Sequence, residues 1–223
     1  MKKKCDVLYI HSVRNPISFE RPVFAIMPMG IIGILNGLRA KGIDVLGINL
    51  AVEKHVDPDY DIAQALKDIE YKVLCTDLHW YVHSYGAMYV VEKSKEINPH
   101  IPTVIGGYTS TIYPLEILEN FPLVDYAVTG DSDLPMDMLM DYLLGRKEIM
   151  LEDIPNLVYR KDDEIITAEK TWVETSLDNI DFIHTDFFEH PDLVRKLTVN
   201  GVTRSFTNLW LCIARGCKYN CGY

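Results

Sequence analysis

Residues 71–107, YKVLCTDLHWYVHSYGAMYVVEKSKEINPHIPTVIGG, contain a complete strand–helix–strand unit. The runs 71–78 and 101–107 are short and mostly apolar, which is typical of strands covered by helices on both faces. The segment 84–97 between them predicts a helix that ends before Asn98-Pro99. Two parallel strands joined by a helix are the repeating unit of an α/β sheet, so this stretch indicates the fold class.

The same alternation extends in both directions from this unit. Strands are predicted at 5–11, 43–50, 71–78, 101–107 and 124–130. Helices are predicted at 29–41, 61–70, 84–97, 114–120 and 132–144. Right-handed crossovers then give a doubly wound, five-stranded parallel sheet, for which we favour the flavodoxin-like strand order 2-1-3-4-5.

The pattern changes after Gly145. Residues 156–170 hold two strand-like runs around the charged segment 161–164, which predicts a hairpin. Residues 171–206 are mixed and polar, and are interpreted as a linker that packs on the rest. We therefore expect an α/β domain at 1–145, a hairpin and linker appendage at 146–206, and the start of another unit at 207–223.

The composition argues against several classes of protein. Of the 223 residues, 48% are hydrophobic and 24% are charged, which is typical of a folded globular protein. No stretch approaches the roughly 18 uncharged apolar residues of a membrane-spanning helix. No signal-peptide core follows the basic N-terminus, so we expect a cytoplasmic protein that does not bind membranes. The net charge of -10 disfavours a nucleic-acid surface, which needs clustered Lys and Arg.

The segments that follow the strands are the candidate ligand site, because open parallel sheets bind ligands at the carboxyl ends of their strands. They carry neither a dinucleotide fingerprint nor a phosphate-binding loop. They are Pro28–Gly33 beyond the first strand, Thr76–Trp80 after the third, Gly106–Ser110 after the fourth and Thr129–Asp133 after the fifth. The glycines indicate close approach of a large ligand to the backbone, with tight turns as the alternative.

Taken together, these positions resemble the cobalamin-binding domain family. Its motif is D-x-H-x-x-G, a spacer of about forty residues, S-x-L, a shorter spacer and G-G. Thr76-Asp77-Leu78 corresponds to S-x-L, and residues 79–105 separate it from Gly106-Gly107. Pro28-x-Gly30-x-x-Gly33 corresponds to the first element, and residues 34–75 separate it from Thr76. The resemblance covers residues 1–145 and implies a Rossmann-like cobalamin-binding domain.

The first element departs from the family pattern in a way that matters chemically. Pro28 and Gly30 stand where the family has its acid and its histidine, so no imidazole can reach cobalt from that position. His11 and His79 fall at predicted strand ends and are the other candidates, although hydrogen-bonded loop residues are the simpler interpretation. The resemblance implies cobalamin contacts at Gly30, Gly33, Thr76, Leu78, His79, Gly106, Gly107, Tyr108 and Gly130.

A cysteine pattern lies near the end of the sequence. The segment Arg215-Gly216-Cys217-Lys218-Tyr219-Asn220-Cys221 looks like the start of the radical S-adenosylmethionine signature, C-x3-C-x2-C, whose third cysteine would be residue 224. In that family three thiolates hold a 4Fe-4S cluster that binds S-adenosylmethionine at its open iron. Cys217 and Cys221 are therefore the candidate metal ligands. For the chain as it stands we favour free thiols, and a zinc site lacks the usual second pair of ligands.

The two resemblances together imply the cobalamin-binding module of a radical S-adenosylmethionine enzyme. The parent reaction would be methyl transfer or a rearrangement at an unactivated carbon. The cluster and S-adenosylmethionine would belong to the full-length parent with its radical domain, and the fragment itself would not catalyse. Two alternatives stay open. A receiver-like signalling domain would use Asp77 as phospho-acceptor, and a flavin-binding carrier would need a Ser/Thr-rich loop after the first strand.

Overall fold

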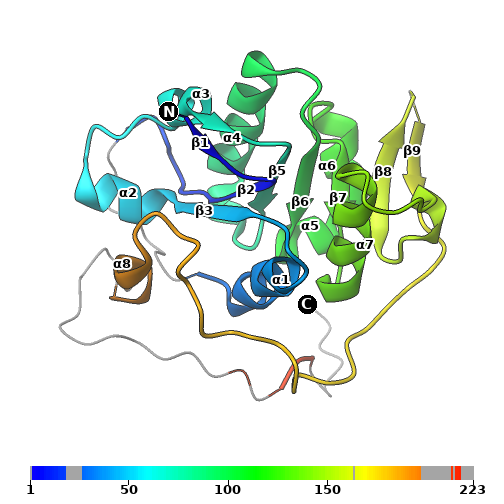
Figure 1. The fold of residues 1–223 in the computed structure, drawn as a ribbon. Coiled ribbons are helices and arrows are strands. Elements are labelled where there is room, and N and C mark those ends of the chain that lie inside the picture. Colours follow the sequence, from blue (N-terminus) through cyan, green and yellow to red (C-terminus); the bar gives the residue numbers. More distant parts are fainter. Residues whose placement is uncertain (1, 19–26, 163, 197–211, 213, 217–223) are drawn as a thin grey trace.

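The computed structural model describes residues 2–18, 27–162, 164–196, 212 and 214–216. Its main sheet has the order β3-β2-β5-β6-β7-β8-β9. The first five strands are parallel: β3 (Val45–Asn49), β2 (Val7–His11), β5 (Val73–Asp77), β6 (Thr103–Gly106) and β7 (Tyr126–Val128). In chain order they read 2-1-3-4-5, so the predicted doubly wound topology is confirmed (Figure 1).

The predicted hairpin is present, and it extends the same sheet. Strand β8 (Leu157–Lys161) pairs antiparallel with β7, and β9 (Glu164–Thr167) pairs antiparallel with β8. In the described part of the chain the sheet therefore has seven strands, the five predicted parallel ones and the two of the hairpin. Tyr159 of β8 lies opposite Tyr126 of β7 and is buried, which joins the hairpin to the sheet by packing as well as by hydrogen bonds.

Most of the predicted helices are found close to their expected bounds. The helices are α1 (Met29–Ala40), α2 (Leu50–Val56), α3 (Ile62–Asp68), α4 (Ser84–Ile97), α5 (Tyr108–Ile112), α6 (Pro114–Asn120), α7 (Asp133–Leu143) and α8 (Pro191–Lys196). Short 3-10 turns lie at η1 (Tyr81–His83) and η2 (Leu151–Asp153). A separate two-stranded parallel sheet joins β1 (Lys3–Lys4) to β4 (Ile69–Glu70).

The helix α2 was not expected from the sequence. Its apolar start, Leu50-Ala51-Val52, reads as a continuation of the strand before it. The structure ends that strand at Asn49, whose side-chain oxygen accepts hydrogen bonds from the backbone N–H groups of Ala51 and Val52. This side-chain cap starts a helix without any break in hydrophobicity.

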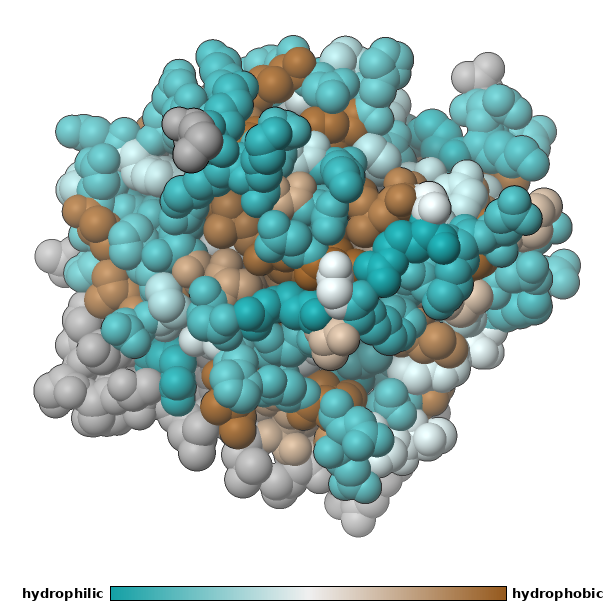
Figure 2. All heavy atoms as spheres, viewed as in Figure 1, coloured by the Kyte–Doolittle hydropathy of each residue, from teal (hydrophilic) through white to brown (hydrophobic). Residues whose placement is uncertain are grey.

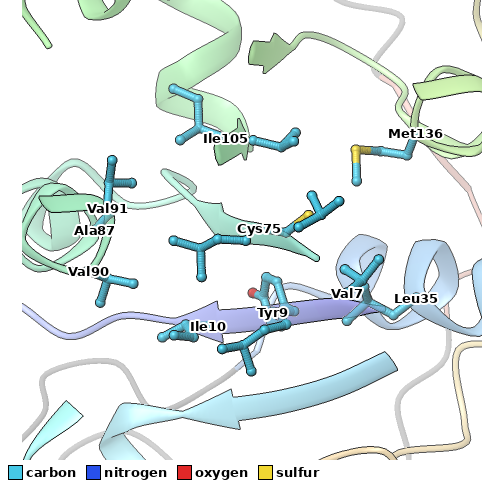
Figure 3. Packing of buried hydrophobic residues seen from close by; sticks show 14 of the residues in the cluster. Val7, Tyr9, Ile10, Leu35, Cys75, Ala87, Val90, Val91, Ile105 and Met136 are labelled. Atoms are coloured by element: carbon cyan, nitrogen blue, oxygen red, sulfur yellow. The ribbon is translucent and has the colours of Figure 1, made fainter. Parts of the chain in front are cut away.

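The core has two halves, one on each face of the sheet. All five residues of β2 and of β5 are buried, as expected for strands covered on both sides. Figure 3 shows Ala87, Val90 and Val91 of α4 on one side of these strands, and Leu35 of α1 and Met136 of α7 on the other. Burial raises the pKa of the thiols of Cys5 and Cys75 to about 12. These two cysteines are small core residues, as the sequence indicated.

The segment after the hairpin packs back onto α1 and β3. Phe187 and Phe188 are buried, and Phe188 forms a bridge with Gly47 of β3. The side-chain amide of Asn36 in α1 donates hydrogen bonds to the carbonyls of Asp181 and His184, at 3.0 and 2.9 Å. The predicted linker therefore contributes to the core.

The surface is mostly hydrophilic on the face shown in Figure 2, with hydrophobic residues in smaller areas between the polar ones. Within the described part of the chain, no helix is long and apolar enough to cross a membrane.

Candidate functional site

A cavity of about 650 Å³ lies at the carboxyl ends of the parallel strands. Its walls come from α1, from β5 and β6 with the turns that follow them, and from the loop between β7 and α7. Most of the lining is apolar and includes Met29, Ile34, Val104 and Met136. A concave, mainly apolar space with a few polar groups is the usual form of a site for a small molecule or cofactor.

The structure brings most of the predicted contact residues together in the wall of this cavity. These residues are Gly30, Thr76, His79, Gly106, Gly107, Tyr108 and Gly130. They come from four separate parts of the sequence, and the sheet register explains how they meet. Thr76 lies beside Ile105, and Asp77 lies beside Gly106, so the ends of β5 and β6 are level.

Three of the glycines shape the wall by lacking a side chain. A Cβ atom at Gly106 would find its nearest neighbour, the Val128 carbonyl oxygen, 3.7 Å away, so this position opens onto free space. Gly107 has a φ of 100° and Gly130 a φ of 60°. L side chains rarely adopt such angles, so glycine is favoured in both turns.

The turns after β6 and β7 are tied together by one side chain. The hydroxyl of Thr111 in α5 donates to the carbonyl oxygen of Gly107 at 2.9 Å. The Thr111 hydroxyl oxygen in turn accepts a hydrogen bond from the backbone N–H of Gly130 at 3.0 Å. This bridge fixes the spacing of two glycine turns on one side of the cavity.

Asn156 organises the remaining loop, which leads from β7 into α7. Its side-chain amide donates to the carbonyls of Asp131 and Trp172, at 3.0 and 2.7 Å. Its own carbonyl accepts a hydrogen bond from the N–H of Thr129. No local pattern predicted this role, because the Trp172 contact joins the loop to a segment that follows the hairpin.

Leu78, one of the predicted contact residues, does not line the cavity, but its backbone supports the cavity wall. Its N–H donates to the carbonyl of Gly106 at 2.7 Å, and its carbonyl accepts from the N–H of Thr109 at 2.8 Å. Its side chain is buried. The Leu78 backbone therefore holds together the segments that follow β5 and β6. Thr76, two residues earlier in β5, uses its hydroxyl to donate to the carbonyl of Ile10, which links β5 to β2.

Gly33, the other predicted contact, lies outside this cavity. A Cβ atom there would come within 2.5 Å of Ile180 Cγ2 and 3.0 Å of Phe182 Cε1. The missing side chain of Gly33 therefore allows the 171–190 segment to pack on α1. The motif position is explained by chain packing in this structure.

Tyr9, His11 and Asp77 form a buried polar cluster towards the carboxyl ends of β2 and β5. The Asp77 carboxylate accepts a hydrogen bond from the Tyr9 hydroxyl at 2.6 Å and pairs with His11 Nδ1 at 2.8 Å. Burial alone would raise the pKa of Asp77, but the charge and hydrogen bond of His11 and the Tyr9 hydroxyl outweigh it and lower the pKa to about 2. The carboxylate is therefore charged, and its Oδ1 atom receives both contacts.

This cluster bears on two of the sequence-based hypotheses. Asp77 is 1% exposed, so its carboxylate is not available to a phospho-donor, and the receiver-like alternative is not favoured. His11 is completely buried and does not line the cavity. Its role is that of a hydrogen-bonded core residue.

His79 is the one histidine that the described structure places in the cavity wall. Its ring meets the Trp80 ring edge-on, with centroids 4.4 Å apart. Burial is the largest influence on the His79 imidazole and lowers its pKa, which favours the neutral ring at pH 7. Tyr108 also lines the cavity but is 66% exposed, and the neighbouring Tyr81 and Tyr85 are exposed and do not line it.

The start of the cysteine segment also reaches this cavity. Arg215 and Gly216 line it, and the Arg215 guanidinium pairs with the Asp133 carboxylate at the start of α7. The sequence offered no signal for this contact, since the two residues lie 82 positions apart. Cys217 and Cys221 lie outside the described residues. Among the described residues, no group of three or more His, Cys, Asp or Glu side chains could hold a metal ion.

The comparisons with known proteins identify the family of this domain. The family model of the B12 binding domain matches residues 22–139. The chain is 21% identical over 145 residues to the hopanoid C-3 methylase of Methylococcus capsulatus, covering 65% of this chain and 27% of that protein. It is 26% identical over 137 residues to an uncharacterized methyltransferase of Pyrococcus horikoshii, covering 61% and 28%.

Solved structures share the fold. The radical S-adenosylmethionine methyltransferase TsrM from Kitasatospora setae, solved with cobalamin and a [4Fe-4S] cluster, matches with a TM-score of 0.57 and 14% identity, over 82% of this chain and 32% of that one. The cobalamin-dependent S-adenosylmethionine radical enzyme OxsB with aqua-cobalamin matches with a TM-score of 0.55 and 14% identity, over 76% and 23%.

The fold and the cavity define a doubly wound α/β domain with a concave, mainly apolar site at its strand ends. The family model covers more than half of the sequence, and the chain belongs to the B12-binding domain family. It spans about a quarter of the length of the curated relatives that it matches.

The residues present fit a cobalamin. The cavity of about 650 Å³ is within the roughly 300–1,000 Å³ of pockets for drug-sized groups, which is room for part of the cofactor such as its nucleotide tail. The backbone at Gly106 can approach a bound group closely, because no side chain intervenes there. Gly30, where the family has its histidine, has no atom within 4 Å of a Cβ position, so the cavity is open at that point.

Proposed function

We propose that this chain is the cobalamin-binding module of a radical S-adenosylmethionine enzyme, with methyl transfer as the parent reaction. The observation that carries the proposal is the cavity at the strand ends, where Gly106 leaves space for a ligand and Gly107 and Gly130 form the tight turns beside it. Membership of the B12-binding domain family and the likeness to two cobalamin-containing radical enzymes support it.

The residues proposed to hold the cofactor are those of the cavity wall. The nucleotide tail of cobalamin would lie beside Thr76, Gly106 and Gly107, where only small side chains leave room. Leu78 would hold the backbone of this wall in place through its two main-chain hydrogen bonds. Bound cobalamin supplies a cobalt that can carry a methyl group, and the protein's part is to bind, orient and enclose it.

The partner of the module would be a radical domain of the same protein, in the cytoplasm. The relatives are about four times longer than the matched region, which leaves room for such a domain. Cys217 and Cys221 would contribute to its cluster, and S-adenosylmethionine would bind there.

The enzyme part of the proposal is tested on the longest protein that the gene encodes. After reconstitution with iron and sulfide and addition of cobalamin and a reductant, S-adenosylmethionine should be cleaved to 5′-deoxyadenosine. Replacing Cys217 by Ala should abolish this cleavage. A protein that assembles its cluster and binds cobalamin, yet leaves S-adenosylmethionine intact, would contradict the proposal.

We further infer that no histidine side chain of this chain would be a ligand of the cobalt. Gly30 replaces the family's histidine, and His11 is buried away from the cavity, which leaves His79 as the candidate to test. The electron paramagnetic resonance spectrum of bound cob(II)alamin should be the same in the wild type and in His79→Ala, with the exposed His100→Ala as control. Nitrogen splitting that disappears only in His79→Ala would overturn this inference.

A further inference from the structure

The Arg215 side chain makes a two-point contact with α7 at the mouth of the cavity. Its Nη1 pairs with Asp133 Oδ2, and its Nη2 donates to Asp133 Oδ1 at 3.2 Å. The side chains of Arg215 and Asp133 are 18% and 17% exposed, so most of the pair is shielded from water. Two parallel bonds between a guanidinium and a carboxylate fix orientation as well as distance.

Phe182, in the segment 171–190, also contacts Arg215. The Arg215 guanidinium carbon lies 5.7 Å from the centre of the Phe182 ring, within the range of a cation–π interaction. Phe182 is buried, and it packs beside Gly33 of α1. Arg215 is thus held between α7 and the 171–190 segment, both of which belong to the folded core.

Arg215 and Gly216 are also part of the cavity wall, together with Gly106 and Gly30. They directly precede Cys217 in the sequence. A contact that fixes Arg215 therefore fixes the beginning of the cysteine segment beside the space that the cofactor would occupy.

We propose that the Arg215–Asp133 pair is a latch that positions the start of the cysteine segment against the cobalamin cavity. Arg215 is a positioning residue in this role. The proposal deepens the proposed function, on which its cofactor part rests. Because the latched residues line the cavity, a cofactor in contact with this wall should favour the latched state, and the latch should in turn favour the cofactor.

Trypsin provides a direct test, because it must draw the side chain of Arg215 into its own binding pocket to cleave after it. Cleavage between Arg215 and Gly216 in the 223-residue protein is followed by mass spectrometry without cofactor. In Asp133→Asn the latch loses its charge, and cleavage at this bond should be roughly tenfold faster, since proteolysis follows the population of the open state. Asp133→Glu keeps a carboxylate and should restore most of the protection.

Two controls separate the latch from a general loss of stability. Lys41→Gln removes the ion pair between Lys41 and Asp137, which lies on the same helix as Asp133 but outside the cavity. It should leave cleavage after Arg215 unchanged. Cleavage at other sites, followed in the same digests, should not differ between the wild type and Asp133→Asn.

Hydroxocobalamin at saturation should slow cleavage after Arg215 further in the wild type, and by much less in Asp133→Asn. Equal cleavage after Arg215 in the wild type and Asp133→Asn would overturn the latch. Cofactor that binds without changing this rate would overturn the coupling. Failure of the wild type to bind cobalamin would instead count against the proposed function, because the first comparison needs no cofactor.

Discussion

Gly106 and Gly107 are neighbours, but their missing side chains serve different purposes. At Gly106 a Cβ atom would point into open space, 3.7 Å from its nearest neighbour. At Gly107 it would lie 2.7 Å from the backbone nitrogen of His79, and the φ of 100° is in the region that favours glycine. Gly106 leaves room for a ligand, whereas Gly107 is required by the turn itself.

Substitution by alanine should separate these two roles. Gly107→Ala should lower the free energy of unfolding by about 1–3 kcal/mol, because the strained backbone and the clash with His79 both act on the folded state. Gly106→Ala should leave stability within about 0.5 kcal/mol of the wild type. Urea unfolding measures both, and equal losses in the two variants would contradict the structural distinction.

His83 gives the protein a pH dependence of known sign. Its side chain is 3% exposed and meets the His11 ring edge-on at 5.4 Å. Burial, with a further contribution from His11, lowers the pKa of His83 from 6.5 to about 4. The unfolded state therefore binds the proton more readily, so stability is complete above pH 6.5 and declines as pH falls towards 4.

The variant His83→Phe keeps a ring and removes the titrating group. Between pH 7 and pH 4.5 the wild type should lose on the order of 2 kcal/mol more stability than this variant. Asp77, whose pKa is lowered from 3.8 to about 2, loses its stabilising contribution mainly below pH 4 and changes little in this window. Parallel stability curves for the two proteins would show that His83 is not the source of the effect.

At the scale of secondary-structure elements, the sequence predicted the strands and helices that depend on local residue patterns. The strands and α4 follow from apolar runs and from Asn98-Pro99, and α4 and α6 have the expected bounds. It did not predict α2, because that helix depends on the Asn49 side-chain cap within a continuous apolar run. It did not place the hairpin in the main sheet, because pairing of β8 with β7 is a long-range contact that the periodicity of either strand cannot show.

The pairing of β8 with β7 makes the hairpin part of the stable unit. A chain that ends at residue 145, the predicted domain boundary, would leave β7 as an edge strand and expose the apolar residues that Leu157, Val158 and Tyr159 cover. We expect it to unfold at a lower temperature than a chain ending at residue 196. Limited proteolysis of the full chain should give a protected fragment that includes β9. A stable fragment that ends near 145 would contradict this.

At the scale of the whole molecule, the site is assembled from distant segments. The sequence identified several of them as candidates but did not show which of them lie side by side. The spacing of Thr76, Gly106 and Gly107 indicated one edge of the sheet, and the parallel register brings these residues together there. Gly33 matched the motif but packs against Ile180, because the 171–190 segment returns to α1. Arg215 and Asn156 carried no local signal, since their partners are distant in the chain.

The central claim is that the cavity at the strand ends binds cobalamin. The most direct test is the amount of hydroxocobalamin that stays with the protein through gel filtration, read from its absorbance, in the wild type and in Gly106→Val. The control Gly37→Val has the same added volume at an exposed glycine of α1 that lies outside the cavity. We expect about one cobalamin per wild-type and Gly37→Val chain, and none in Gly106→Val with unchanged thermal unfolding. Retention that is equal in Gly106→Val, or absent in the wild type, would contradict the account.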